Sequence, residues 1–110
     1  MEKFSESFSS LRATFEREVL RWPSVSSHTT FGWPSYLVES ELFAVVSDQG
    51  VSLTRLPDED RRRLAATHRV SPFVANGRAV ASWTTVAVTA DDVDALFPAV
   101  KKSYESAAAA

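Results

Sequence analysis

The beginning of the chain carries apolar side chains at helical spacing. These residues recur every three or four positions and are Phe4, Phe8, Leu11, Phe15 and Val19. Such spacing places them on one face of an α-helix, while serine and charged residues occupy the opposite face. The helix is predicted to end at Trp22 and Pro23, because the residue before a proline is disfavoured in the α region. A loop is expected over 24–27.

The pattern changes to that of β-strands after His28. Strands are predicted at Thr29–Phe31, Tyr36–Val38, Leu42–Ser47 and Val51–Arg55. The segment Gly32–Ser35 is expected to form a break or bulge between the first two strands, and Glu39–Glu41 a polar turn. The third strand is almost entirely apolar, which is typical of a strand covered on both faces.

A hairpin loop is predicted at Asp48–Gly50, where Gly50 can adopt positive φ. In the strand that follows, Val51 and Leu53 are expected to point inward, and Ser52 and Thr54 outward.

The second half of the chain begins with a short charged helix. Pro57 suits a first helical position, and three acidic residues after it complement the helix dipole, so a helix is predicted from Pro57 to about Thr67. A loop is expected over His68–Arg78 because Pro72 and Gly77 interrupt it. Val80–Val88 is rich in β-branched residues and is predicted to be the last strand.

A terminal helix is predicted to follow Thr89, which forms a capping-box pattern with Asp92. Pro98 leaves two interpretations open. Either one helix bends at Pro98, or a single turn precedes a helix that starts near Ala95. We favour the bend.

The resulting order is α-β-β-β-β-α-β-α, with helices at both ends of a mainly antiparallel meander. This order is typical of an α+β domain. A chain of 110 residues fits one domain, so we expect a single domain over residues 1–110.

Composition and charge limit the reactions and binding partners that the chain can have. The chain has no cysteine, which excludes disulfides and thiolate chemistry, and its formal net charge is −2. A slightly acidic balance argues mildly against nucleic acid as the partner. The N-terminal segment has scattered charges and no long apolar run, so we expect a cytoplasmic protein with no membrane contact.

The sequence contains no recognisable catalytic constellation. His28 and His68 are the only histidines, and both are expected in exposed loops. Zinc catalysis requires three protein ligands, the serines do not lie in a nucleophile elbow, and the three glycines are isolated, so no phosphate loop can form. We therefore predict no catalytic, metal or cofactor-binding residues and no cofactor.

The arginine residues offer the clearest candidate for a functional surface. The candidates for nucleic-acid contact are Arg61, Arg62, Arg69 and Arg78. Three successive arginines at 61–63 sweep about 200° around a helix, so they cannot share one face. Arg62 and Arg63 also follow Asp58 and Glu59 by four residues, which favours a solvated helix face with internal ion pairs.

The aromatic residues between Phe31 and Phe43 have two alternative interpretations: they pack in the core, or they form a ligand-binding surface. Strand alternation sends neighbouring side chains to opposite faces. We favour core packing for Trp33, and more strongly for Trp83. Trp33 is nevertheless the best candidate for an exposed ring, so Trp33 and Tyr36 are the predicted interaction surface if one exists here.

Several short segments carry a family resemblance through their order and spacing. They are Phe31-Gly32, Tyr36-Leu37-Val38, Leu42-Phe43-Ala44, the run VSLTRLP at Val51–Pro57, Pro72-Phe73, Gly77-Arg78 and Trp83. Together they resemble the N-terminal domain of TfoX and the related YjbR-like proteins. The resemblance implies a twisted meander with flanking helices and a regulatory or DNA-related role, and it brings no catalytic residues with it.

The chain departs from that family where positive charge is usual. Glu39-Ser40-Glu41 stands where a Gly-Lys hairpin is common, and Thr29-Thr30 where a basic residue and a methionine are frequent. Phosphate neutralisation dominates DNA affinity. We therefore expect a small non-enzymatic regulatory or interaction module that binds a protein partner or forms a homodimer. Weak DNA binding through the arginines is the alternative, and an unrecognised enzyme is the least favoured hypothesis.

Overall fold

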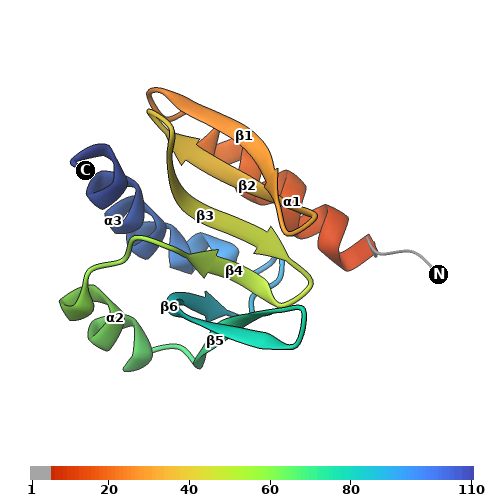
Figure 1. Ribbon diagram of the computed structural model, residues 1–110. Helices are drawn as coiled ribbons and strands as arrows, with labels where there is room; N and C mark the ends of the chain where they lie inside the picture. The colour runs from red at the N-terminus through yellow and green to blue at the C-terminus, as the bar shows by residue number, and fades with distance from the viewer. Residues whose placement is uncertain (1–5) are drawn as a thin grey trace.

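The computed structural model describes residues 6–110, so the predicted helix residue Phe4 lies outside the described part (Figure 1). The first half comprises α1 (Glu6–Val19), β1 (Val25–Thr30), β2 (Trp33–Val38), β3 (Glu41–Ser47) and β4 (Gly50–Leu53). The second half comprises α2 (Asp58–Ala65), β5 (Val70–Ala75), β6 (Arg78–Val86), the 3-10 helix η1 (Val93–Leu96) and α3 (Phe97–Ala108). The α+β class is confirmed, and so is the predicted succession of helices and strands apart from the additional strand β5.

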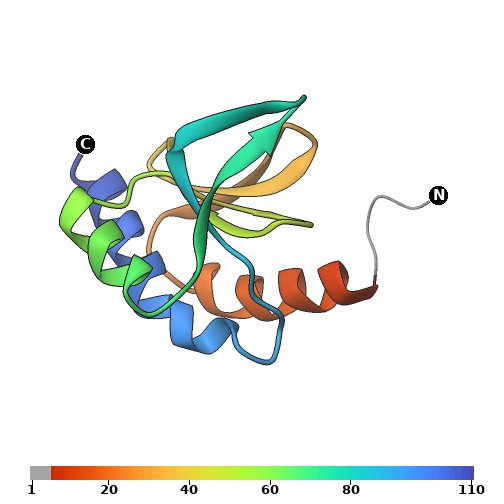
Figure 2. The ribbon, with the colours of Figure 1, turned by 90° about the horizontal axis from the view of Figure 1, so that it is seen from below.

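The strands form one antiparallel sheet in the order β1-β2-β3-β4-β6-β5. The helices α1 and α3 pack on one side of it, and α2 lies beside α3 (Figure 2). None of the helices in residues 6–110 combines the length and the apolar character needed to cross a membrane. A Cα radius of gyration of 12.8 Å agrees with about 13 Å for a single domain of this length.

The predicted apolar stripe of α1 faces the core. Its buried residues are Phe8, Leu11, Phe15 and Val19. The Phe15 ring lies 5.1 Å from that of Tyr36 on β2 and 5.8 Å from that of Phe97 on α3. Burial of one such side chain contributes roughly 1.5–3 kcal/mol, so the stripe is sufficient to hold α1 on the sheet.

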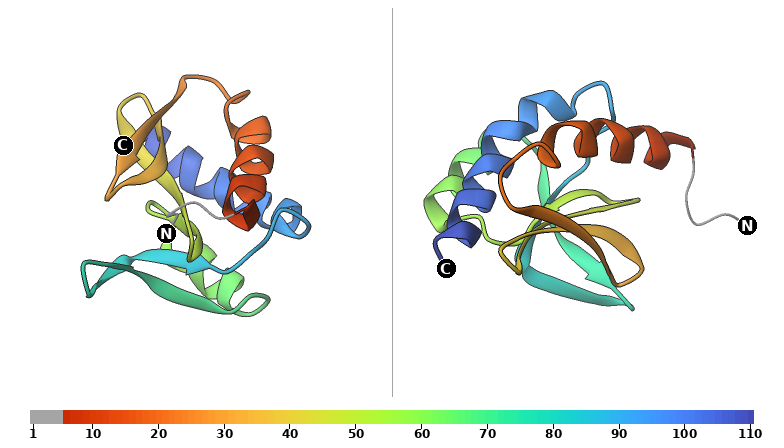
Figure 3. Two further views of the ribbon diagram at one scale, coloured as in Figure 1. Left: turned by 90° about the vertical axis from the view of Figure 1, so that its right-hand side faces the viewer. Right: turned by 90° about the horizontal axis from the view of Figure 1, so that it is seen from above.

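The sheet curls, so that the β1–β2 turn approaches the β5–β6 hairpin on the side away from the helices (Figure 3). Phe31, in the turn between β1 and β2, stacks at 6.0 Å on Phe73 of β5 and lies 5.7 Å from Trp83 of β6. The turn between β3 and β4 reaches the same hairpin, because Gln49 hydrogen-bonds to the main chain of Val74. The prediction that Ser52 points outward was wrong. Its side chain points into the interior of the curled sheet and is fully buried, with its hydroxyl 2.7 Å from that of Thr85.

The prediction of a loop over His68–Arg78 was wrong, because β5 occupies most of it. Pro72 is tolerated because β5 is an edge strand, where the missing N–H need not face a neighbour. Beside it β6 carries extra residues: Pro72 pairs with Thr84, whereas the next residue, Phe73, pairs with Val80. This irregularity bends the hairpin back toward the β1–β2 turn.

The predicted break at Gly32–Ser35 was also wrong. β1 begins at Val25 and pairs without interruption with β2, from Val25 opposite Val38 to Thr30 opposite Trp33. Only Phe31 and Gly32 lie in the turn. The interruption detected in the sequence is therefore a tight two-residue hairpin.

The favoured bend at Pro98 was wrong, and the alternative of two segments is correct in outline. The 3-10 helix η1 precedes α3, and Pro98 lies in the first turn of α3, where its missing N–H costs no helical hydrogen bond. The predicted contact between Thr89 and Asp92 is confirmed, because the Thr89 N–H donates to the Asp92 carboxylate at 2.6 Å.

Candidate functional site

The structure spreads the four predicted arginines rather than gathering them. Arg61 and Arg62 lie on α2, Arg69 lies between α2 and β5, and Arg78 opens β6 at the far end of the β5–β6 hairpin. Arg78 pairs with Ala75, the last residue of β5, so the length of β5 separates it from Arg69. A phosphate grip built from all four side chains is not formed.

Two arginines of α2 form ion pairs within the helix; the expected pair of Arg63 with Glu59 is present, whereas Asp58 pairs with Arg61 rather than with Arg62. Arg61 is ion-paired with Asp58. Arg63 lies 3.1 Å from Glu59 and 3.7 Å from Asp60. These pairs are solvent-exposed and contribute little to stability, but they neutralise most of the positive charge that a nucleic acid would meet here.

The predicted interaction surface at Trp33 and Tyr36 was wrong, because both rings belong to the core. Trp33 is 9% exposed and packs 5.3 Å from Phe8, which confirms the core packing favoured for it. Tyr36 is fully buried, and its hydroxyl donates to Glu16 at 2.7 Å. Both rings pack against α1, Trp33 on Phe8 and Tyr36 on Phe15.

The two histidines do not contribute to a common site. His28 is exposed on β1 rather than in a loop, whereas His68 follows α2 as expected and is half-buried. The His68 ring Nδ1 lies 3.0 Å from the Thr67 hydroxyl. Among residues 6–110, no three side chains of the metal-ligating types gather at one place.

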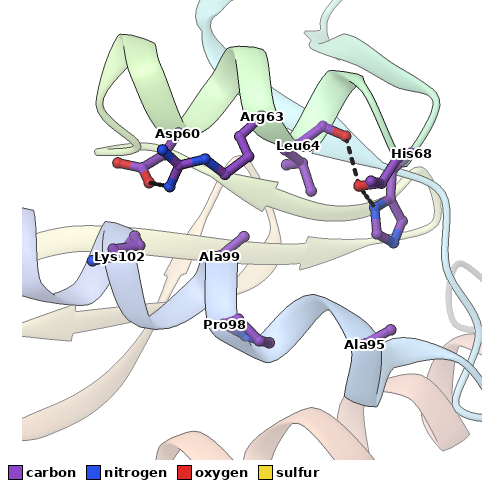
Figure 4. Close-up of a pocket in the computed structure, with 9 residues that line it drawn as sticks. Asp60, Arg63, Leu64, His68, Ala95, Pro98, Ala99 and Lys102 are labelled. Atoms are coloured by element: carbon purple, nitrogen blue, oxygen red, sulfur yellow. Dashed lines mark hydrogen bonds and ion pairs between the residues drawn. The ribbon is translucent and has the colours of Figure 1, made fainter.

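A groove of about 220 Å³ separates α2 from η1 and α3 (Figure 4). Its floor is apolar and comprises Leu64, Ala95, Pro98 and Ala99. Asp60 lies at one end and His68 at the other, eight positions apart, which is about 12 Å at the rise of a helix. The groove therefore does not bring its carboxylate and its imidazole together as an acid–base pair.

A different surface collects exposed apolar side chains. Phe31 is 51% exposed, and the half-buried Trp83 lies against it. The buried ring of Phe73 supports both, at 6.0 Å from Phe31 and 5.2 Å from Trp83. Val74 is 47% exposed, but it follows Phe73 directly on β5, so its side chain points to the opposite face of the strand. We call Phe31 and Trp83 the aromatic surface. It lies where the β1–β2 turn meets the folded β5–β6 hairpin.

The backbone at Phe31 shows that this exposed ring is held at a conformational cost. Phe31 has φ +54° and precedes a glycine with φ +81°, as two-residue hairpins of type I′ require. The β5–β6 turn has nearly the same geometry, but there Asn76 has φ +53°. Asparagine-glycine is the preferred pair for this turn, whereas a bulky residue at positive φ is an outlier.

The aromatic surface was missed from the sequence for a physical reason. Phe31-Gly32 lacks the asparagine or aspartate that usually precedes glycine in a two-residue hairpin, so the sequence pattern predicts a strand end and a break there. The contacts with Phe73 and Trp83 depend on the curl of the sheet, which local pattern does not reveal. Comparison of the chain with family models, with curated proteins and with solved structures found no match.

Proposed function

We propose that this chain is a non-enzymatic protein-interaction module that binds its partner through the aromatic surface of Phe31 and Trp83. The observation that carries the proposal is the half-exposed phenylalanine in a left-handed turn position. Asparagine, the residue at the equivalent position Asn76 of the β5–β6 turn, suits this backbone better than phenylalanine. Strained backbone of this kind is concentrated at binding and active sites.

The chemistry of the surface favours an apolar segment of a protein as the ligand. Aromatic rings that are fixed by neighbours lose little conformational freedom on binding, which is why they dominate interface energetics. Phe31 rests on Phe73 and Trp83 and is therefore held in place before a partner arrives. The resemblance to TfoX N-terminal and YjbR-like proteins supports a regulatory role for such binding.

The decisive variant is Phe31→Asn, which removes the ring and restores the preferred turn pair. Tagged wild-type protein, F31N and Leu20→Ser are compared as bait for proteins from the source cells, with quantitative mass spectrometry. Leu20 is the matched control because it is 45% exposed and lies at the end of α1, away from the aromatic surface. We expect partners that the wild type and L20S retain and F31N loses by about tenfold or more, since a hot-spot aromatic contributes about 2 kcal/mol or more.

The result that contradicts the proposal is equally clear. Identical protein sets recovered by all three baits, or no protein enriched by the wild type, would refute it. The comparison requires that F31N remains folded. We expect it to fold, because asparagine before glycine is the preferred pair for this turn.

Weak DNA binding stays the alternative prediction, and the separation of Arg69 from Arg78 gives it less support than the aromatic surface gives protein binding. It predicts an affinity that falls with salt, with a log–log slope of about −0.9 for each phosphate contacted. Fluorescence anisotropy with a labelled duplex at low salt tests it. Unchanged anisotropy across the protein titration would exclude this alternative.

A further inference from the structure

We propose that the free edge of β1 pairs with β1 of a second copy of this chain, which joins two sheets about a two-fold axis. β1 is a terminal strand of the sheet and forms its upper border in Figure 1. Its register with β2 runs over all six residues without a shift. Alternate residues of such a strand direct their N–H and C=O groups away from the sheet, as a template for another strand.

The opposite margin of the sheet shows what a protected edge looks like in the same molecule. β5 contains Pro72, and its pairing with β6 is irregular after that residue. Gln49 also occupies the N–H and C=O of Val74 with its side-chain amide. Proline, irregularity and covering groups are the usual devices against edge pairing. None of these three devices is present on β1 among the described residues.

The charges of β1 and its surroundings permit a second copy. The strand reads VSSHTT, without acidic residues, lysine or arginine, and its four central residues are exposed. Glu39 lies at one end only, where its N–H donates to the carbonyl of Ser24 at 3.4 Å. Antiparallel pairing of two copies therefore places the two Glu39 side chains at opposite ends of the new interface, so no like charges meet.

A two-fold axis fixes which residues can meet. An axis perpendicular to the sheet keeps each side chain on its own face, so a residue near the axis must oppose itself. Centring on Ser27 pairs Ser27 with its own copy and Ser26 with His28 of the second copy. All of these contacts are between small or neutral groups, and cross-strand hydroxyl pairs are favourable. Two-fold dimers are also the commonest assembly of identical chains.

The test measures oligomeric state by sedimentation velocity over a wide range of concentration. We expect the wild type to be a dimer at high concentration and Ser27→Lys to be a monomer, because that change places two ammonium groups against each other at the axis. Ser10→Lys is the matched control, since Ser10 is exposed on α1, and it should dimerise like the wild type. Hydrogen exchange adds a measurement without substitution: alternate amides of β1 should exchange more slowly as the protein concentration rises.

The possible outcomes distinguish dimerisation through β1 from association through the aromatic surface. A wild type that is monomeric at all concentrations, or a dimer that S27K leaves intact, would overturn it. F31N keeps β1 unchanged and should still dimerise while losing its partner protein. Loss of the dimer in F31N with retention in S27K would instead assign self-association to the aromatic surface and refute pairing through β1.

Discussion

The side-chain amide of Gln49 and the main chain of Val74 form two reciprocal hydrogen bonds. The amide nitrogen donates to the Val74 carbonyl, and the amide oxygen accepts from the Val74 N–H, each at 2.9 Å. Gln49 lies in the β3–β4 turn, twenty-five residues away in sequence. It imitates a neighbouring strand at the edge of β5, and so it holds the folded hairpin beneath Phe31 without adding a strand.

Replacing Gln49 with alanine should release this end of the hairpin. Two neutral hydrogen bonds are lost, each worth about 0.5–1.5 kcal/mol, so the free energy of unfolding should fall by about 1–3 kcal/mol. The Val74 amide should exchange faster in hydrogen-exchange NMR. Gln49→Glu separates the two bonds, because its carboxylate can accept from the Val74 N–H but cannot donate to the Val74 carbonyl, so less protection than in the wild type is expected. Equal protection of Val74 in the wild type and Q49A would show that the edge is held by something else.

The glycines at 50 and 77 should respond very differently to alanine. A Cβ on Gly50 would overlap the carbonyl oxygen of Val86 and lie 2.9 Å from the Cα of Ala87, in backbone with φ +120°. Gly77, with φ +76°, would place its Cβ in open space. G77A should therefore cost about 1–2 kcal/mol for left-handed backbone alone, whereas G50A should cost about 4 kcal/mol or more. Urea denaturation of both variants measures this, and similar losses would contradict the packing of β4 against β6.

Sequence pattern was sufficient for the elements whose residues act locally. The α1 stripe, the β3 apolar run and the contact between Thr89 and Asp92 depend on neighbours within a few positions, and all three were predicted correctly. β5 was missed because Pro72 is compatible with a strand only at an edge, and edge position is set by the whole sheet. Phe31 and Ser52 were misplaced for the same reason, since the curl of the sheet decides which side chains it encloses.

Tyr36 should make stability fall at alkaline pH. Burial of the phenol, and then its hydrogen bond to Glu16, raise the pKa of Tyr36 well above its ordinary value of 10.0. The unfolded chain therefore loses this proton before the folded chain does. The stabilisation is complete below about pH 10 and declines above it by up to about 1.4 kcal/mol per pH unit. Urea denaturation at about pH 8 and about pH 11 should show a steeper decline for the wild type than for Tyr36→Phe.

The same pair of variants tests the strength of the Tyr36 contact at neutral pH. Y36F leaves the Glu16 carboxylate without its phenol donor and should cost about 1.5–3 kcal/mol. Tyr104→Phe is the control: its hydroxyl donates to the neutral carbonyl of Pro23 at 2.7 Å, so about 0.5–1.5 kcal/mol is expected. Parallel pH profiles for the wild type and Y36F would contradict the assignment of the alkaline loss to Tyr36.

Ser103 joins α3 to the sheet through a buried hydroxyl. It donates to the Phe43 carbonyl at 2.7 Å and accepts from the Arg55 N–H at 3.1 Å. Ser103→Ala leaves both main-chain groups without this partner, which should cost about 1–3 kcal/mol. Ser106→Ala, on the same helix and only half-buried, should change stability by less than about 0.5 kcal/mol. Thermal denaturation compares the two, and equal effects would remove the proposed bridging role.

The β2–β3 turn should be improvable, because neither of its residues is suited to its backbone. Glu39 has φ +50° and Ser40 has φ +71°, which are left-handed values that favour glycine. Ser40→Gly should raise the free energy of unfolding by about 1 kcal/mol, since the removed strain exceeds the added freedom of the unfolded chain. Ser71→Gly, at an exposed strand position of β5, makes the same chemical change in extended backbone and should lower it by about 0.5–1 kcal/mol. Opposite signs for one substitution at two positions would show that backbone conformation, rather than loss of the hydroxyl, decides the outcome. A loss of stability in both variants would contradict the left-handed assignment at Ser40.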